Sequence, residues 1–140
     1  MYDDVISIIR EYGIKAELLI FSDTVESVSK ASKLTNEPSN RIIKTLLTKA
    51  STDYVVVIAR GDRKINFSKL AKYLKCDVRM ASYDEVLNVL GVPPGAVTPI
   101  SRRVLSLRRI LDPKILDEPY VVCGGGTLNS LIKVSTCLLY

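Results

Sequence analysis

Apolar and polar residues in the first quarter of the chain follow two different periods. Apolar residues at helical spacing, closed by a glycine, predict a helix over residues 3–12, and the apolar run at 16–21 predicts a short strand. A second helix is predicted over residues 22–34, because Asp23 followed by Glu26 has the form of a capping box. The polar stretch TNEPSN then ends this helix.

The segment NRIIKTLLTKA, residues 40–50, fits two structures when it is taken alone. In a helix Lys44 would face water, whereas in a strand it would share a face with Ile42 and Leu46. The strand is favoured, because the segment is rich in β-branched residues and a short polar turn separates it from a second β-branched run at 54–59. The pattern therefore predicts a hairpin and leaves Lys44 within a sheet that is apolar on both faces.

The rest of the chain predicts further helices and strands around a proline-rich loop at 92–101. The predicted helices are 67–75 and 82–91, and the predicted strands are 76–81, 103–110, 119–123 and 129–135. The second of these helices has a capping box, Ser82 with Glu85, and stops at Gly91. This order of elements predicts one α+β domain over residues 1–140, with a mixed, curved β-sheet flanked by helices.

Composition narrows the class of protein. With 140 residues, of which 47% are apolar, the chain can bury a core of its own. It has no run of about eighteen apolar residues, so we expect no membrane span. The first residues are acidic and amphipathic, unlike a signal peptide, and we therefore expect a soluble, cytoplasmic protein.

The chain has no histidine, which excludes Ser-His and Cys-His nucleophile pairs and histidine-containing zinc sites. Its three cysteines, Cys76, Cys123 and Cys137, are far apart and form no C-x-x-C motif. We expect reduced thiols that pack as small hydrophobes, no metal site and no cofactor.

The formal net charge is +5, with a pI near 9.2, which favours an acidic partner such as nucleic acid. Basic residues gather at 60–64, 101–103 and 107–110. Each cluster is equally consistent with a solvated loop or strand edge.

Three features could carry chemistry. The run CGGGT at 123–127 lacks the lysine and Ser/Thr of a phosphate loop, so it is either a flexible turn or a place where backbone approaches a ligand. In the loop 92–101, prolines stiffen the backbone around Gly95, whose amide could serve an oxyanion or carbonyl; the alternative is a stiff connection. Lys44 either extends its ammonium to the sheet edge or holds a phosphate or carbonyl.

Together these features resemble the YbaK/ProX family, which includes the editing domain inserted in bacterial prolyl-tRNA synthetases. The resemblance rests on five stretches in order: TVESVSKASKL, RIIKTLL, VVVIARGDRKINFSKLAKYL, DEVLNVLGVPPGAVTPIS with a G-x-x-x-P motif, and YVVCGGGTLNSLIKVS. It covers residues 22–136 and implies a pseudo-barrel form of the α+β fold. It also implies hydrolysis of mischarged aminoacyl-tRNA, with the ribose hydroxyl of the substrate assisting a water while the protein supplies position and electrostatics.

Carried onto this sequence, the resemblance gives Lys44 the role of anchoring the terminal nucleotide. Thr45 would also belong to the pocket, although an ideal strand points it to the opposite face, so that its role needs a twist or bulge. Phe21 is our hypothesis for an apolar wall that limits the size of the amino acid.

The same resemblance implies that Gly95, like Lys44, is a catalytic residue. Gly95 and its neighbours would present backbone amides to the aminoacyl group, while Pro99 holds the loop. Gly124 and Gly125 would border the pocket from the other side. Ser101 stands where family members commonly have a glycine, which places the choice of substrate in question. The chain also stops where relatives often continue through a final helix.

The first hypothesis is a free-standing deacylase that acts in trans on tRNA(Pro) carrying alanine or cysteine. It binds the 3′ end of aminoacyl-tRNA, with prolyl-tRNA synthetase as a candidate partner. The alternative is a tRNA- or synthetase-binding module of the same fold without catalysis. A small-nucleotide-binding protein ranks third, because its motif is missing. The sequence leaves the oligomeric state open.

Overall fold

A computed structural model describes residues 2–139 of the chain, without the side chains of residues 2, 3 and 138. The helices are α1 (Tyr2–Glu11), α2 (Val28–Thr35), α3 (Phe67–Leu74), α4 (Tyr83–Leu90) and α5 (Arg102–Leu105). The strands are β1 (Ala16–Ile20), β2 (Ile43–Ala50), β3 (Asp53–Arg60), β4 (Val78–Met80), β5 (Arg108–Leu111), β6 (Tyr120–Gly124) and β7 (Ser130–Ser135). Short 3₁₀ turns are η1 (Ser39–Arg41), η2 (Pro94–Ala96), η3 (Pro113–Asp117) and η4 (Thr136–Leu139).

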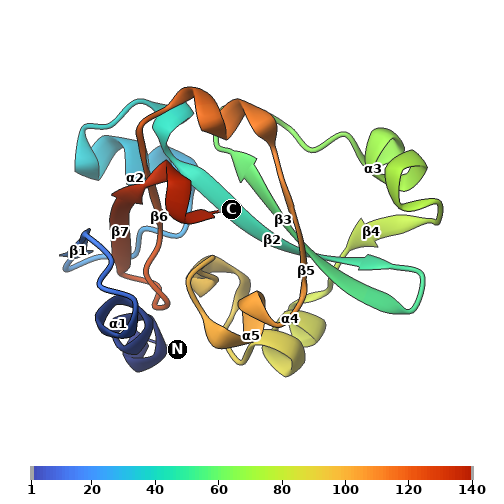
Figure 1. The fold of residues 1–140 in the computed structure, drawn as a ribbon, viewed down its shortest axis with the longest axis horizontal. Coiled ribbons are helices and arrows are strands. Elements are labelled where there is room, and N and C mark those ends of the chain that lie inside the picture. The colour runs from blue at the N-terminus through green and yellow to red at the C-terminus, as the bar shows by residue number, and fades with distance from the viewer. Residues whose placement is uncertain (1, 140) are drawn as a thin grey trace.

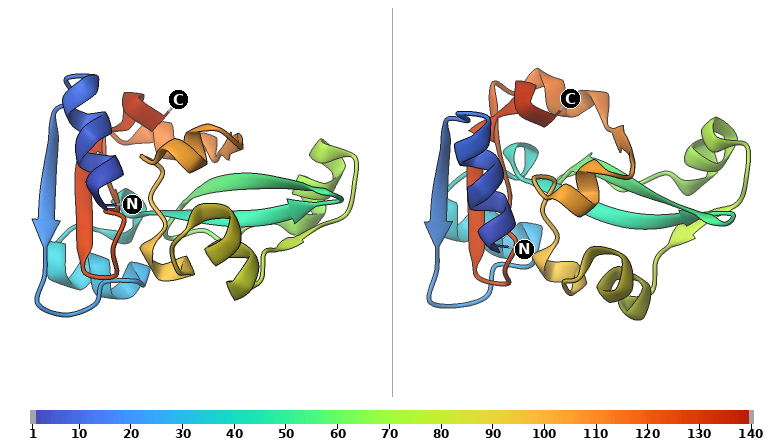
Figure 2. Two further views of the ribbon diagram at one scale, coloured as in Figure 1. Left: turned by 90° about the horizontal axis from the view of Figure 1, so that it is seen from below. Right: turned by 60° about the horizontal axis from the view of Figure 1, so that its bottom comes forward.

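Within residues 2–139 the strands form two sheets, one ordered β1-β7-β6 and one ordered β4-β2-β3-β5 (Figure 1). The first sheet is antiparallel, and in the second β5 runs parallel to β3. The long β2–β3 hairpin lies across the strands of the first sheet (Figure 2, left). A bridge between Ile42 and Val122 links the two sheets. The predicted α+β class with mixed strand directions is confirmed, and the strands do not close into a barrel.

The predicted hairpin is also confirmed. β2 and β3 pair without interruption from Ile43 opposite Arg60 to Ala50 opposite Asp53. Residues of both faces are buried, as expected for β-branched strands covered on two sides. The turn is tight, and Ser51 takes a left-handed backbone conformation with φ of 57°.

The second helix begins later than the sequence predicts. α2 starts at Val28 with Ser27 as its N-cap, and the capping box expected at Asp23 does not form. Asp23 accepts only from the amide of the next residue, at 2.8 Å. The cause is a distant contact, because the amide of Val25 donates to the carbonyl of Leu128 at 2.8 Å and holds this segment extended.

The predicted strand over 103–110 is wrong in its first half. Residues 102–105 form the single turn α5, which Ser101 caps by accepting from the Val104 amide at 3.1 Å. Val104 is fully buried, so one helical turn serves to bring its side chain into the core. The strand β5 then covers 108–111, where it pairs with β3.

The other elements follow the prediction closely. The capping box of Ser82 and Glu85 forms at the start of α4, and Gly91 ends the helix with φ of 76°. The glycine-rich stretch turns between β6 and β7, and the short turn η4 follows β7.

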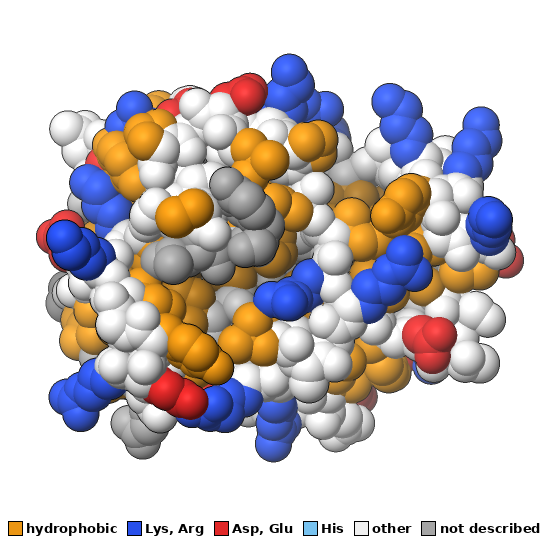
Figure 3. All heavy atoms as spheres, in the orientation of Figure 1, with side chains coloured by type: hydrophobic (Ala, Val, Ile, Leu, Met, Phe, Trp, Pro, Cys, Tyr) orange, Lys and Arg blue, Asp and Glu red, His pale blue; other side chains and the backbone are white. Residues whose placement is uncertain are grey.

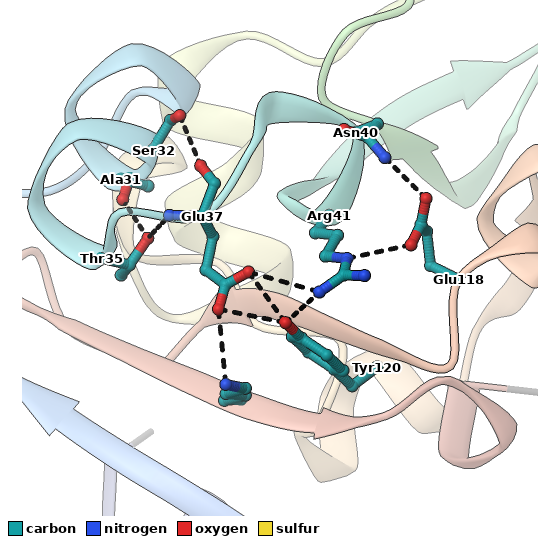
Figure 4. Close-up of polar contacts among 9 residues, drawn as sticks. Ala31, Ser32, Thr35, Glu37, Asn40, Arg41, Glu118 and Tyr120 are labelled. Atoms are coloured by element: carbon teal, nitrogen blue, oxygen red, sulfur yellow. Dashed lines mark hydrogen bonds and ion pairs between the residues drawn. The ribbon is translucent and has the colours of Figure 1, made fainter.

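A polar network fixes the entrance to β2 against the first sheet (Figure 4). Glu37 accepts from the Tyr120 hydroxyl at 3.1 Å and from the Lys133 ammonium at 3.3 Å. Arg41 donates to Glu118 at 3.0 Å and to Tyr120, above whose ring its guanidinium lies. Because these side chains come from η1, β6, β7 and their connections, they set where β2 begins.

Candidate functional site

A small cavity lies at the junction of the two sheets, where β2 begins. Its volume is about 90 Å³. Four segments enclose it: the start of α2, the first residues of β2, the loop around η2 and the turn between β6 and β7. The lining residues are Val25, Glu26, Ser27, Val28, Ala31, residues 42–46, Pro94, Gly95, Val97, Gly124, Ser130 and Leu131.

The cavity lies along a part of β2 that has no ladder partner on one side. On the side away from β3, the strand β4 pairs only with Thr48 to Ala50. β6 lies near the start of β2 and bridges to it at Ile42, but no described strand pairs with residues 43–46 on that side, and these consecutive residues line the cavity. Thr45 reaches the cavity in this way without a bulge, since its pairing with β3 is regular.

Lys44 lies half-buried in this cavity without an acidic partner. Among the side chains that the structure describes, no carboxylate lies within 4.0 Å of its ammonium. Lys49, at the other end of the same strand, has its ammonium 3.6 Å from Glu85 and 5.1 Å from the ring of Tyr54. Desolvating part of a lysine without a counter-charge is unfavourable, which is expected where the charge serves a ligand.

The hydroxyl of Thr45 is also without a partner. Thr45 is 7% exposed, and its Oγ1 is buried with no hydrogen bond to any described residue. On the same strand, the hydroxyl of Thr48 donates to the Val55 carbonyl at 2.8 Å. An unsatisfied buried hydroxyl costs roughly 1–3 kcal/mol. A polar group left free in a cavity is therefore a candidate ligand contact.

The loop around η2 brings backbone amides to the opposite wall. Pro93 and Pro94 have no N–H, and the Pro93 carbonyl accepts from Ala96 at 2.9 Å. Neither the Gly95 nor the Val97 amide donates to a described residue. Gly95 lies so close to the segment before α2 that a Cβ at this position would be 2.6 Å from the Cβ of Glu26.

Gly124 permits the close contact between β6 and this loop. A Cβ at Gly124 would lie 2.3 Å from the carbonyl oxygen of Val97, a separation that no side chain tolerates. A glycine is therefore required if Val97 is to stay in the cavity wall. The amide of Gly125 donates to the Ser130 carbonyl at 3.0 Å and holds the turn next to it.

The structure thus places four of the eight predicted site residues on one cavity: Lys44, Thr45, Gly95 and Gly124. The other four lie outside its lining. They are Phe21, which packs beside Val25 and Leu131; Gly125, within the β6–β7 turn; Pro99, buried after the loop; and Ser101, the buried cap of α5.

Sequence reasoning missed Glu26, Ser130 and the apolar wall formed by Val97 and Leu131. Glu26 was assigned to a capping box, and it instead lies at the cavity rim with Lys30 3.3 Å away. The Thr24 side chain, ahead of the backbone amide and Lys30, lowers the pKa of Glu26, so this carboxylate stays ionised. Only the observation that α2 starts late could have placed it here.

The site combines a lysine ammonium, a free hydroxyl, two free amides and a rim carboxylate around an apolar wall. Such a set can bind a polar group and orient an ester carbonyl without supplying a nucleophile. Over residues 2–139, His, Cys, Asp and Glu form no cluster of three that could hold a metal ion. In the same part of the chain, no helix has the length and apolar character required to cross a bilayer.

The family model described as "Aminoacyl-tRNA editing domain" matches residues 22–139 of the chain. Among curated relatives, the proline–tRNA ligase of Thermotoga maritima is 33% identical over 102 residues, which are 72% of this chain and 17% of the ligase. The corresponding ligase of a Sulfurihydrogenibium species is 41% identical over 83 residues, 58% of this chain and 14% of the ligase. The chain therefore spans less than a fifth of the length of these ligases.

Solved structures share the fold over nearly the whole chain. A protein described only as hypothetical superposes with a TM-score of 0.86 at 27% identity, over 97% of this chain and 91% of its own. A protein described as a candidate trans-editing enzyme for prolyl tRNA synthetase gives a TM-score of 0.88 at 19% identity, over 99% and 88% of the two chains. At 19% identity the second likeness shows the fold alone.

Proposed function

Since this chain belongs to the aminoacyl-tRNA editing domain family, we propose that it is a deacylase that hydrolyses the ester of mischarged tRNA(Pro) carrying alanine or cysteine. The observation that carries the proposal is the meeting of Lys44 and Thr45, both without partners, with the free amides of Gly95 and Val97 in one cavity. Proline–tRNA ligases are among the relatives that match most of the chain, which favours tRNA(Pro).

Each group has a separate task in the proposed reaction. The ammonium of Lys44 binds the phosphate or a polar group of the terminal adenosine next to the ester. The amides of Gly95 and Val97 donate to the ester carbonyl oxygen, where negative charge develops as water attacks. The carboxylate of Glu26 at the rim attracts the α-ammonium of the amino acid. No side chain of the site acts as nucleophile, so the ribose hydroxyl of the substrate positions the water.

The size of the cavity supports a small amino acid. The cavity has a volume of about 90 Å³, and Gly95 and Gly124 are in close contact with the segments next to them. The cavity, with Val97 and Leu131 in its lining, therefore admits only a few non-hydrogen atoms. Alanine and cysteine differ from each other by a single sulfur atom, and apolar pockets separate such groups by only about 1–3 kcal/mol. The order of preference between these two must therefore come from experiment.

The proposed deacylase acts in trans, on tRNA that a synthetase has already charged. The structural neighbour described as a candidate trans-editing enzyme, of which this chain covers 88%, supports this arrangement. Prolyl-tRNA synthetase, the source of such mischarged tRNA, is then a candidate partner.

The test is deacylation of tRNA(Pro) charged in turn with alanine, cysteine, serine and proline, with wild type and Lys44→Ala side by side. We expect release of one or more small non-cognate amino acids by wild type, little release of proline, and loss of the activity in the variant. Survival of every ester at high enzyme concentration would contradict the proposal and favour a tRNA-binding module without catalysis.

A further inference from the structure

A second concave surface lies on the far side of the β2–β3 hairpin from the cavity. It is an open groove of about 720 Å³ between α3 and β5, with the segment 63–66 along its rim. We call this surface the basic groove. Figure 3 shows basic side chains gathered over α3 and β5 with apolar surface between them.

The charge of the basic groove is high and mostly unpaired. Its cations are Arg63, Lys64, Lys69, Arg108 and Arg109, all exposed. The lining contains one carboxylate, Asp112, which lies 3.7 Å from Arg63. Five cations and one anion give the groove +4, against +5 for the whole chain. The other four cations have no carboxylate within 4.0 Å among residues 2–139.

Such a concentration of charge is unfavourable for folding, because like charges repel and Asp112 offsets only one of the five cations. Paired surface cations elsewhere, such as Arg79 with Glu85 and Arg60 with Asp62, show that this fold accommodates counter-charges readily. The positive groove therefore fits a polyanion that supplies the missing negative charge on binding.

An aromatic side chain completes the groove. Tyr73 of α3 is 66% exposed, and the guanidinium of Arg108 lies 5.7 Å from its ring centroid. Exposed aromatic rings beside arginines are typical of RNA-binding surfaces, where they stack with unpaired bases while the cations contact phosphates. This arrangement favours RNA over an acidic peptide, to which Tyr73 offers no matching group.

We propose that the basic groove binds the sugar-phosphate backbone of the tRNA substrate away from its 3′ end. The inference deepens the proposed function and rests on it for the identity of the RNA. The cavity at the start of β2 then holds the charged end, while the groove beyond β3 holds another part of the same molecule. Two separate contacts give the enzyme affinity for whole tRNA that the small cavity alone does not provide.

The test measures binding of uncharged tRNA(Pro) at several salt concentrations, so that its result does not depend on deacylation. The groove variant is Lys69→Gln with Arg108→Gln. The matched control is Arg10→Gln with Lys15→Gln, which removes the same charge at exposed positions outside the groove. We expect the groove variant to bind about tenfold or more weakly, with the slope of log affinity against log salt reduced by about 2. The control should stay close to wild type.

Several results would overturn the proposal. The groove variant could bind as wild type does, or both variants could weaken equally, which would mean that only overall charge matters. Unchanged RNA binding with loss of binding to polyglutamate would instead assign the groove to an acidic protein. Lys64→Gln with Lys69→Gln provides a second groove variant if the first does not fold, as judged by circular dichroism.

Deacylation of charged tRNA by the same variants separates the two proposals. If the groove serves the tRNA body, KM rises by a similar factor while kcat changes little, because the cavity is untouched. If the chain binds tRNA through the groove but no ester is hydrolysed, the deacylase proposal fails and the groove assignment stands.

Discussion

The two ends of β2 each carry a lysine and a threonine, which have polar partners at one end and none at the other. At the far end, Lys49 lies beside Glu85 and the hydroxyl of Thr48 is bonded to the Val55 carbonyl. At the cavity end, neither Lys44 nor Thr45 has a partner among the described residues. One strand therefore shows how this fold satisfies a lysine and a threonine when they serve stability alone. The contrast favours a role for the side chains of Lys44 and Thr45 in binding a ligand.

The largest expected effect is on the two lysines. Lys44→Ala should lower kcat/KM for deacylation by about 100-fold or more, as the loss of a charge-stabilising contact does in other active sites. Its melting temperature should stay close to wild type, because no ion pair is lost. Lys49→Ala should keep activity. Equal loss of activity in both variants would contradict this prediction, because it would mean that Lys44 contributes only to the overall positive charge.

The next effect concerns the backbone that shapes the cavity. Gly124→Ala should reduce the free energy of unfolding by about 1–3 kcal/mol, because its methyl group meets the Val97 carbonyl and overpacks the wall. Activity should fall with it, since the Val97 amide moves. Gly13→Ala is the control, because Gly13 has positive φ and no neighbour within 4 Å. Chemical denaturation and the deacylation assay separate the two causes. Gly13→Ala introduces backbone strain without a clash and should keep activity, whereas Gly124→Ala introduces the clash alone.

Substitutions of the two threonines test the same difference between the ends of β2, with smaller expected effects. Thr45→Val removes a hydroxyl that has no partner, so stability should be unchanged or slightly higher, while activity falls roughly tenfold, the equivalent of one hydrogen bond. Thr48→Val should do the reverse and lower stability by about 1 kcal/mol with activity retained. Denaturation curves and kcat/KM for both variants check this. If Thr45→Val were destabilising and fully active, its hydroxyl would not serve a ligand.

The smallest effect lies at the partnered end and depends on pH. Hydrogen bonds from Arg79 first, then from the Ser82 amide and Tyr54, hold the pKa of Glu85 well below its usual value of 4.5. Because the folded pKa is depressed, the stabilisation is fully present above pH 4.5 and is lost as the pH falls below it. Wild type should therefore melt above Glu85→Gln at pH 7, with the gap narrowing below pH 4.5. A gap that stays constant down to pH 3 would rule out this linkage.

Local pattern was sufficient where neighbours in sequence decide the structure. The β2–β3 hairpin, α3 and the capping box of α4 depend on spacing, β-branched content and a cap three residues away, and all were predicted. The sequence likewise identified Lys44 as a candidate site residue, because partly burying a lysine between apolar residues of a strand is energetically unfavourable wherever the strand lies.

Prediction failed where a distant segment competes with local preference. The start of α2 moved because Leu128 accepts from Val25, and the turn α5 formed because Val104 had to reach the core. The same limit applied to the site. Glu26 belongs to the cavity only because α2 begins after it, and Phe21 lies outside because Val25 and Leu131 occupy the wall.

The spacing of apolar residues and the properties of single side chains are sufficient to predict the α+β class, most of the helices and strands, and the presence of an unusual lysine. The complete fold is needed to see that residues 43–46 of β2 lack a paired strand on one side, that the strands divide into two sheets and that Thr45, Gly95 and Gly124 line one cavity with Lys44. These outcomes depend on hydrogen bonds and backbone contacts between residues remote in the chain, which no local pattern encodes.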